Sequence, residues 1–142
     1  MLEALSISLN KAAVLGFVMY ILGAAVLFAL FQFIYTRVTP HREFELIRSG
    51  NVAAAIALGG AVIGFAIPAS NVIAYSINML DFIVWAVIAA VVQLLAFLMT
   101  SLVLKGASAR IKNGEIASGI YIAAVAISVG MLNAACMTPS TN

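Results

Sequence analysis

Charged residues are scarce in this chain: only 8% of its 142 residues are Asp, Glu, Lys or Arg, whereas 65% are hydrophobic. An ordinary soluble domain carries about 25% charged residues. With so few polar groups, the chain cannot cover a hydrophobic core with a hydrophilic surface. The composition therefore excludes an ordinary water-soluble protein and predicts one that is surrounded by lipid.

Reactive residues are also few. The single cysteine, Cys136, excludes an internal disulfide and any site built from several thiolates, although in an oxidising periplasm it could form a disulfide between subunits. The single histidine, His41, has only Glu43 and Glu45 beside it, which are too few ligands for a metal site. No serine or cysteine has a base at motif spacing, and no glycine-rich phosphate loop is present. We therefore expect no catalytic residues, no metal and no cofactor.

Four long hydrophobic blocks make up most of the chain. They cover residues 12–35, 52–75, 82–104 and 116–135, and none contains a charged residue. At about 1.5 Å per residue, each is long enough to cross a hydrocarbon core of about 30 Å. The blocks are continuous and do not alternate, so they predict membrane-spanning helices and not barrel strands. A signal peptide is the alternative for the first block, but its apolar region is longer than the usual ~7–15 residues.

Local signals set the expected ends of two helices. Pro68 predicts that the second helix kinks or ends near Ile67, because proline removes a helical hydrogen bond. Residues 69–80 would then belong partly to an outer connection. Asp81 is the expected N-cap of the third helix.

The first polar connection, residues 36–50, predicts a short helix that begins at Thr39-Pro40 and ends before Gly50. Its charges can pair as Arg42 with Glu45, or as Glu45 with Arg48. Two arrangements stay open. The helix lies flat on the membrane with Phe44 and Ile47 among the headgroups, or it is an ordinary solvated connector.

The cationic residues predict the orientation. Six of the seven lie in the two connections on one side of the membrane, so the positive-inside rule predicts that both connections are cytoplasmic and both termini outside. The cations form no run with interleaved aromatics, which argues against nucleic-acid binding. They are candidate contacts for anionic lipid or for a peripheral cytoplasmic protein. These residues are Arg37, Arg42, Arg48, Lys105, Arg110 and Lys112.

An internal duplication is the strongest pattern after hydropathy. Residues 47–53 are echoed 64 positions later by residues 111–117, and the same offset pairs Phe33 with Phe97 and Ile56 with Ile120. Each copy holds two spans, so both copies have the same orientation and form parallel repeats. We expect one all-α membrane domain over residues 1–142, made of hairpins at residues 12–75 and 82–135. Parallel repeats suit a symmetric bundle, a pore-forming oligomer or a scaffold.

Small residues recur one turn apart in the second and fourth blocks. Such residues let helix backbones approach closely, so they predict packing seams between these two helices or between subunits. The alternative is that the glycines thin the wall beside a conduit. The residues are Ala53, Ala57, Gly60, Ala61 and Gly64, with Ala126, Gly130 and Ala134 in the fourth block.

Three amide side chains are the polar candidates within the spans. Gln93 lies in the middle of the third block, and Asn71 and Asn133 lie near the outer ends of the second and fourth. They predict either interhelical hydrogen bonds or the lining of a passive pore. No ionisable residue lies near the centre of a block, which argues against a pump.

Residues 50–60, Gly-Asn-Val-Ala-Ala-Ala-Ile-Ala-Leu-Gly-Gly, continue through Gly64-Phe65-Ala66-Ile67. Here the sequence resembles the bacterial inner-membrane family called domain of unknown function 350, the YjfL-like proteins. The likeness covers most of the chain, including residues 111–133. It implies an inner-membrane location, a duplicated two-helix unit and, from some relatives, a link to envelope stress, but no activity.

Together these observations predict a non-catalytic protein of the bacterial inner membrane. The expected role is a self-associating scaffold or envelope-stress component that contacts lipid and forms homo-oligomers. An oligomeric channel or small-solute pore is the alternative.

Overall fold

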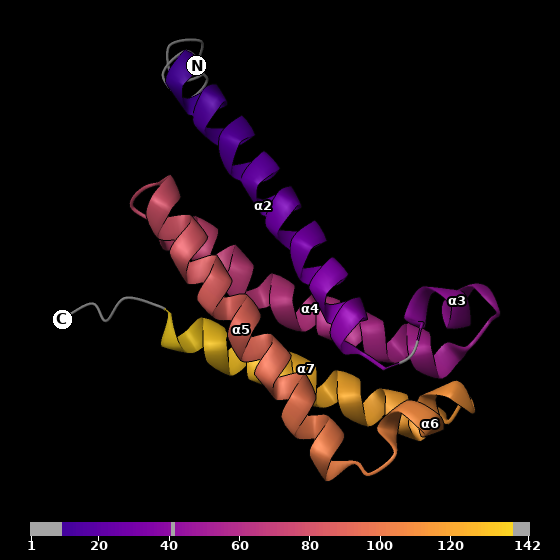
Figure 1. Cartoon of the computed structure of the whole chain (residues 1–142). Coiled ribbons are helices and arrows are strands. Elements are labelled where there is room, and N and C mark those ends of the chain that lie inside the picture. Colours follow the sequence, from indigo (N-terminus) through magenta and orange to yellow (C-terminus); the bar gives the residue numbers. More distant parts are fainter. Residues whose placement is uncertain (1–9, 41, 138–142) are drawn as a thin grey trace, which may run out of the picture.

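The computed structural model describes residues 10–40 and 42–137, and these residues form helices and short connections without a strand (Figure 1). Within these residues, four helices are long and apolar enough to cross a membrane, as the sequence predicted: α2 (Lys11–Val38), α4 (Val52–Tyr75), α5 (Met79–Val103) and α7 (Ile116–Cys136). Two short helices, α3 (Glu43–Arg48) and α6 (Ala107–Lys112), follow α2 and α5. His41 falls outside the described residues.

Helices α4 and α7 form the centre of the fold and run in the same direction. Near their N-terminal ends, the Asn51 side chain donates to the Ile111 oxygen at 2.8 Å. Near their C-terminal ends, the Asn71 side chain donates to the Ala134 oxygen at 2.7 Å. Helix α5 packs against both α4 and α7, so these three helices make one compact unit.

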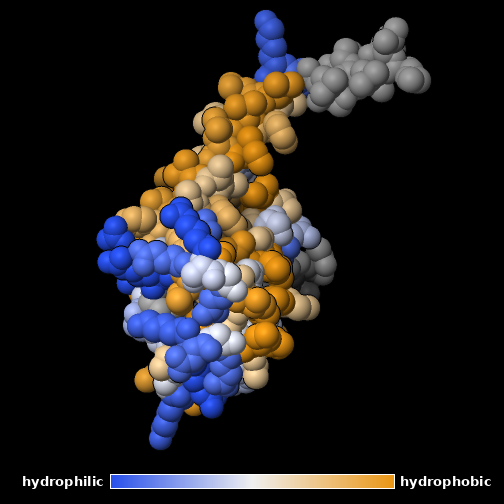
Figure 2. All heavy atoms as spheres, turned by 90° about the vertical axis from the view of Figure 1, so that its right-hand side faces the viewer, coloured by the Kyte–Doolittle hydropathy of each residue, from blue (hydrophilic) through white to orange (hydrophobic). Residues whose placement is uncertain are grey.

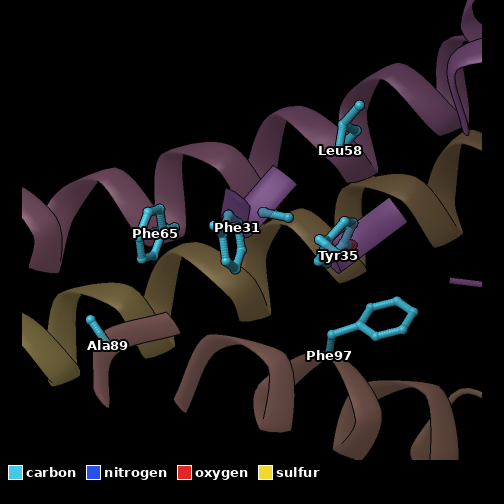
Figure 3. Packing of buried hydrophobic residues seen from close by; sticks show 7 residues of the cluster. Phe31, Tyr35, Leu58, Phe65, Ala89 and Phe97 are labelled. Atoms are coloured by element: carbon cyan, nitrogen blue, oxygen red, sulfur yellow. The ribbon is translucent and has the colours of Figure 1, made fainter. Parts of the chain in front are cut away.

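Helix α2 joins this unit along a narrow face. Only Phe31 and Tyr35 of its residues are buried. The Phe31 ring stacks on Phe65 of α4 with centroids 4.2 Å apart, and Tyr35 meets Phe97 of α5 edge-on at 5.1 Å (Figure 3). Toward its N-terminus α2 diverges from the other helices (Figure 1), and Phe17 there is 68% exposed.

Pro68 lies inside α4, which continues to Tyr75. Of the two outcomes expected near Ile67, a kink or an end, the end is therefore wrong. The expected long outer connection is therefore only residues 76–78. Proline removes one amide donor, but in a membrane helix neighbouring helices can compensate for that loss. Pro68 is buried against such neighbours.

Helix α5 begins earlier than expected because two residues share its N-terminal cap. Asn78 is the N-cap, and its side-chain oxygen accepts from the Asp81 amide at 2.9 Å. Asp81 accepts in turn from the Ile77 amide at 3.1 Å. The arrangement differs from a capping box, because Asp81 accepts from the amide of the residue before the N-cap and not from the N-cap itself. Asp81 therefore lies in the first turn of α5 and is not the N-cap.

Helix α3 is shorter than expected and begins at Glu43 instead of Thr39-Pro40. The predicted pair of Arg42 with Glu45 forms at 2.8 Å on its exposed side. Phe44 is exposed, but Ile47 packs against the bundle, so the prediction that both enter the headgroups is wrong for Ile47. One face of α3 therefore contributes to the core.

The two short helices end in the same way, at positions 64 residues apart. Gly50 and Gly114 have φ of +86° and +75°, which glycine adopts without strain. The same two backbone hydrogen bonds form at each end. After α3, the Gly50 amide donates to the Ile47 oxygen and the Asn51 amide to the Leu46 oxygen. After α6, the Gly114 amide donates to the Ile111 oxygen and the Glu115 amide to the Arg110 oxygen. Both ends are Schellman motifs, each of which aims the chain into a long helix.

Candidate functional site

The small residues of α4 meet those of α7 within one chain. A Cβ atom on Gly60 would overlap the backbone of Ala123, and one on Gly119 would lie 2.6 Å from the Ala53 oxygen. Lipid gives no strong drive to associate apolar helices, so close backbone contact is a main source of helix pairing in a membrane. We call this contact of α4 with α7 the glycine seam, made by Ala53, Gly60, Gly64, Gly119, Ala123, Ala126 and Gly130.

Gly64 is the point of closest approach in the glycine seam. A side chain there would overlap the Ala126 oxygen and the Gln93 amide, and one on Gly130 would overlap the Gly64 oxygen. That oxygen would normally accept from the amide four residues later, where Pro68 has none to give. The carbonyl that Pro68 releases therefore faces Gly130 of α7, where a Cα hydrogen offers a weak donor.

The other predicted packing residues lie beside the glycine seam. Ala57 belongs to a buried cluster with Ile111 and Ile122, and Ala61 packs in the aromatic cluster around Phe31. Ala134 is buried and accepts the hydrogen bond from Asn71. All eight predicted packing residues are thus brought to the contacts between helices of one chain, and none of the seam glycines is left open for a second chain.

All three predicted amides bond across helices to main-chain oxygens. Gln93 is 1% exposed, and its Nε2 donates from α5 to the Ala126 oxygen of α7 at 3.0 Å. Asn71 bonds from α4 to α7, as described above. Asn133 of α7 donates back to the Ala89 oxygen of α5 at a long 3.5 Å. The three amides therefore tie the central helices together instead of lining an open channel through the chain.

The predicted basic residues gather at one end of the bundle, around α3 and α6. Figure 2 views this end and shows hydrophilic side chains over it, with α2 rising from it as an apolar column. Two cations form ion pairs, Arg42 with Glu45 at 2.8 Å and Arg110 with Glu115 at 3.3 Å. Arg37 lies over the Phe33 ring at 4.5 Å. We call the exposed residues Arg37, Arg42, Arg48, Lys105, Arg110 and Lys112 the basic face.

The basic face keeps a net positive charge. Within the part of the chain that the structure describes, Arg48, Lys105 and Lys112 form no ion pair. A hollow of about 540 Å³ opens on this face between Arg42 and Lys112. The arrangement can attract anions.

Glu43 lies in the first polar connection, where an exposed acid is expected, but its side chain is buried. It is only 2% exposed, beneath the basic face. The available signal was its spacing, because Glu43 and Ile47 are four residues apart and share the inward face of α3. Tyr35 and Thr39, at the same end of the bundle, are also buried, so this end of the bundle is more polar inside than hydropathy indicated.

No group of three metal-ligating side chains occurs among residues 10–40 and 42–137. Cys136 is exposed at the end of α7 opposite the basic face.

Comparison with known proteins gives one family. The model of a domain of unknown function, DUF350, matches residues 8–137. The chain is 36% identical over 126 residues to the UPF0719 inner membrane protein YjfL of Escherichia coli strain K12, covering 89% of this chain and 96% of the relative. The protein of the same name from Escherichia coli O157:H7 matches with the same identity and coverage. No solved structure matches the chain.

Proposed function

This chain belongs to the DUF350 family, and from that premise we propose that it is a non-catalytic membrane component that presents the basic face to anionic lipid headgroups. Its relatives are named as inner membrane proteins, and its four apolar helices fit a multi-pass protein of that membrane. The observation that carries the proposal is the gathering of six cations at one end of the bundle. A scaffold or envelope-stress role is the broader function that such a component would serve.

The orientation is part of the proposal. The basic face is cytoplasmic and both termini are outside, because translocated connections seldom carry such an excess of Lys and Arg. The outer connection, residues 76–78, carries no cation. A C-terminal alkaline phosphatase fusion should be active and a C-terminal fluorescent protein fusion dark. The reverse pattern would overturn the orientation.

The chain is also proposed to be a duplicated hairpin. This is supported by the matching Schellman motifs at Gly50 and Gly114 and by the parallel course of α4 and α7. The glycine seam adds support, since Gly60 meets Ala123 and Gly64 meets Ala126, positions close to the 64-residue offset.

Lipid binding can be tested on the purified chain. A Lys or Arg near an anionic surface contributes about 1 kcal/mol of attraction, so several should retain anionic lipid. Native mass spectrometry in mixed phosphatidylglycerol and phosphatidylcholine should show retained phosphatidylglycerol. Retention should fall in Arg48→Gln/Lys112→Gln but not in Lys11→Gln, whose cation lies at the other end of α2. Equal retention in all three proteins would contradict the proposal.

The same face is the proposed surface for a peripheral cytoplasmic protein, whose recognition would rest on the same cations. Charge reversal at Arg48 and Lys112 would then abolish recruitment in cells. If lipid retention is unaffected by these changes while recruitment is lost, protein is the partner and lipid is not.

Self-association is proposed through α2 and not through the seam glycines, which are used within the chain. The outer part of α2 is apolar and contacts few described residues; Leu22, for example, is 60% exposed. In a Cys136→Ser background, Leu22→Cys should give cross-linked dimers in membranes. Leu132→Cys on α7, a position that is 67% exposed, is the matched control. Equal cross-linking at both positions would remove α2 as the interface.

A channel or small-solute pore stays the alternative function, and its lumen would have to lie between copies of the chain. The cavity beside Gln93 is only about 10 Å³, too narrow for a conduit. Solute flux into liposomes, lost on Gln93→Leu, would favour a path through the chain against this expectation. Flux that is independent of Gln93 would fit a lumen between copies.

A further inference from the structure

A small, largely buried cavity lies where α2, α4, α5 and α7 meet. Its volume is about 10 Å³, and its lining includes Tyr35 of α2 with Gln93 and Thr100 of α5. These three side chains are 1%, 1% and 5% exposed. Polar groups buried this deeply normally have hydrogen-bond partners, because leaving them unpaired disfavours folding.

The hydrogen-bonding capacity of the cavity follows from the bonds already made. The Ala126 oxygen can only accept, so Nε2 of Gln93 must face it and Oε1 must lie on the opposite side of the amide. That Oε1 has no partner among the described residues. The Thr100 hydroxyl donates its hydrogen to the Ala96 oxygen at 2.7 Å, which leaves its own oxygen as an acceptor.

Tyr35 supplies the complementary group. Its hydroxyl can donate a hydrogen, and within the part of the chain that the structure describes it makes no hydrogen bond. The Glu43 carboxylate acts on this hydroxyl electrostatically but does not accept its hydrogen. The cavity is therefore lined by residues that offer one hydroxyl donor and two oxygen acceptors.

We propose that this cavity binds a single water molecule that accepts from Tyr35 and donates to Gln93 and Thr100. Buried waters typically make about three hydrogen bonds, and a cavity of this volume holds about one. A monovalent cation fits less well, since it would be held only by uncharged oxygens and could not accept the tyrosine hydrogen. The water links α2 to α5 and, through Gln93, to α7, and this site is independent of the function proposed above.

The sign of one stability change tests the proposal. An unpaired buried hydroxyl disfavours folding, so removing it from a dry cavity would leave the melting temperature unchanged or raise it. Removing a hydroxyl that binds water should lower it. For the purified full-length chain in detergent, we expect Tyr35→Phe to lower the melting temperature by about 3 °C or more. Tyr121→Phe, at a site that is 44% exposed, is the control and should have no effect.

A second variant keeps the test independent of any other defect at Tyr35. Thr100→Val removes one acceptor, and Thr100→Ser should restore it. Because both variants lose the same water, Tyr35→Phe/Thr100→Val should lower the melting temperature by less than the sum of the single changes. Additive losses, or a rise with Tyr35→Phe, would overturn the proposal. Replacing sodium by choline should change nothing; stabilisation by sodium would assign the cavity to a cation instead.

Discussion

The contact between α4 and α7 and the contact of α2 with the bundle are made by opposite kinds of residue. Helices α4 and α7 meet through glycine and alanine, so their backbones are in contact. Amide side chains add hydrogen bonds between helices, from Asn71 of α4 and from Gln93 of α5 to backbone oxygens of α7. Helix α2 carries large apolar residues and contacts the bundle mainly through aromatic rings. A large apolar side chain has a similar free energy in lipid and against another helix. Hydrophobicity alone therefore holds a helix in the membrane but does not hold it against a neighbouring helix.

The largest expected effect tests the glycine seam directly. Gly64→Leu should prevent the folded chain from accumulating, because even a Cβ there overlaps the backbone of α7. Gly59→Leu is the matched control on the same helix, since nothing lies within 4 Å of a Cβ at that position. Size-exclusion profiles in detergent measure both. A monodisperse Gly64→Leu protein would break the contrast between the two regions.

The aromatic attachment of α2 should give the next effect. Phe31→Ala removes a buried ring stacked on Phe65 and should lower the free energy of unfolding by about 3–5 kcal/mol. Phe17→Ala, in the exposed outer part of the same helix, should change it by less than about 1 kcal/mol. Unfolding titrations in sodium dodecyl sulfate compare the two. Similar losses at both positions would mean that the outer part of α2 is packed as tightly as its inner part.

A smaller effect is expected at the end of the central pair. Asn51 caps α4 by accepting from the Ala54 amide at 2.9 Å, and it also donates to the Ile111 oxygen. Asn51→Ala should therefore cost about 1 kcal/mol of stability. Asn113→Ala, at an exposed position of the other connection, is the control. The same titration measures both, and an unchanged Asn51→Ala protein would show that the glycine seam holds without its end contacts.

The smallest effect is expected on the basic face. The ion pair of Arg42 with Glu45 is 83% and 61% exposed, so solvent screens it strongly. Arg42→Gln should change the stability by less than about 0.5 kcal/mol. A larger loss would mean that this pair contributes to the packing of α3, and thermal unfolding of the purified protein can detect it.

Sequence predicted the four membrane spans because each is a long uncharged run, and their ends differ from the prediction by a few residues. It could not decide whether the second helix ends at Pro68 or continues past it, since that depends on the packing of α4 against Gly130 of α7. It also missed that Asn78 caps α5 and that Glu43 is buried. These outcomes depend on contacts between segments far apart in the chain, which hydropathy does not encode.

The candidate site was predictable in its residue types but not in its pairings. Small residues and mid-span amides marked α4, α5 and α7 as helices that pack, yet the same pattern allowed partners within the chain or in another subunit. The structure brings Gly60 to Ala123 and Gln93 to Ala126. Lipid tails and helix surfaces are about equally apolar, so hydrophobicity does not decide which helices pair. The pairing is determined by shape and by hydrogen bonds.

The glycine seam also has a consequence for entropy. Glycine and alanine have no side-chain rotamers to lose when they are buried, whereas ordering a long side chain can cost up to about 2 kcal/mol. The glycine and alanine residues between α4 and α7 therefore lose no side-chain entropy when the helices meet. Once the contact has formed, these residues have no alternative rotamers. This pair should be the most sharply defined part of the molecule, a fixed reference against which the more loosely held α2 can move.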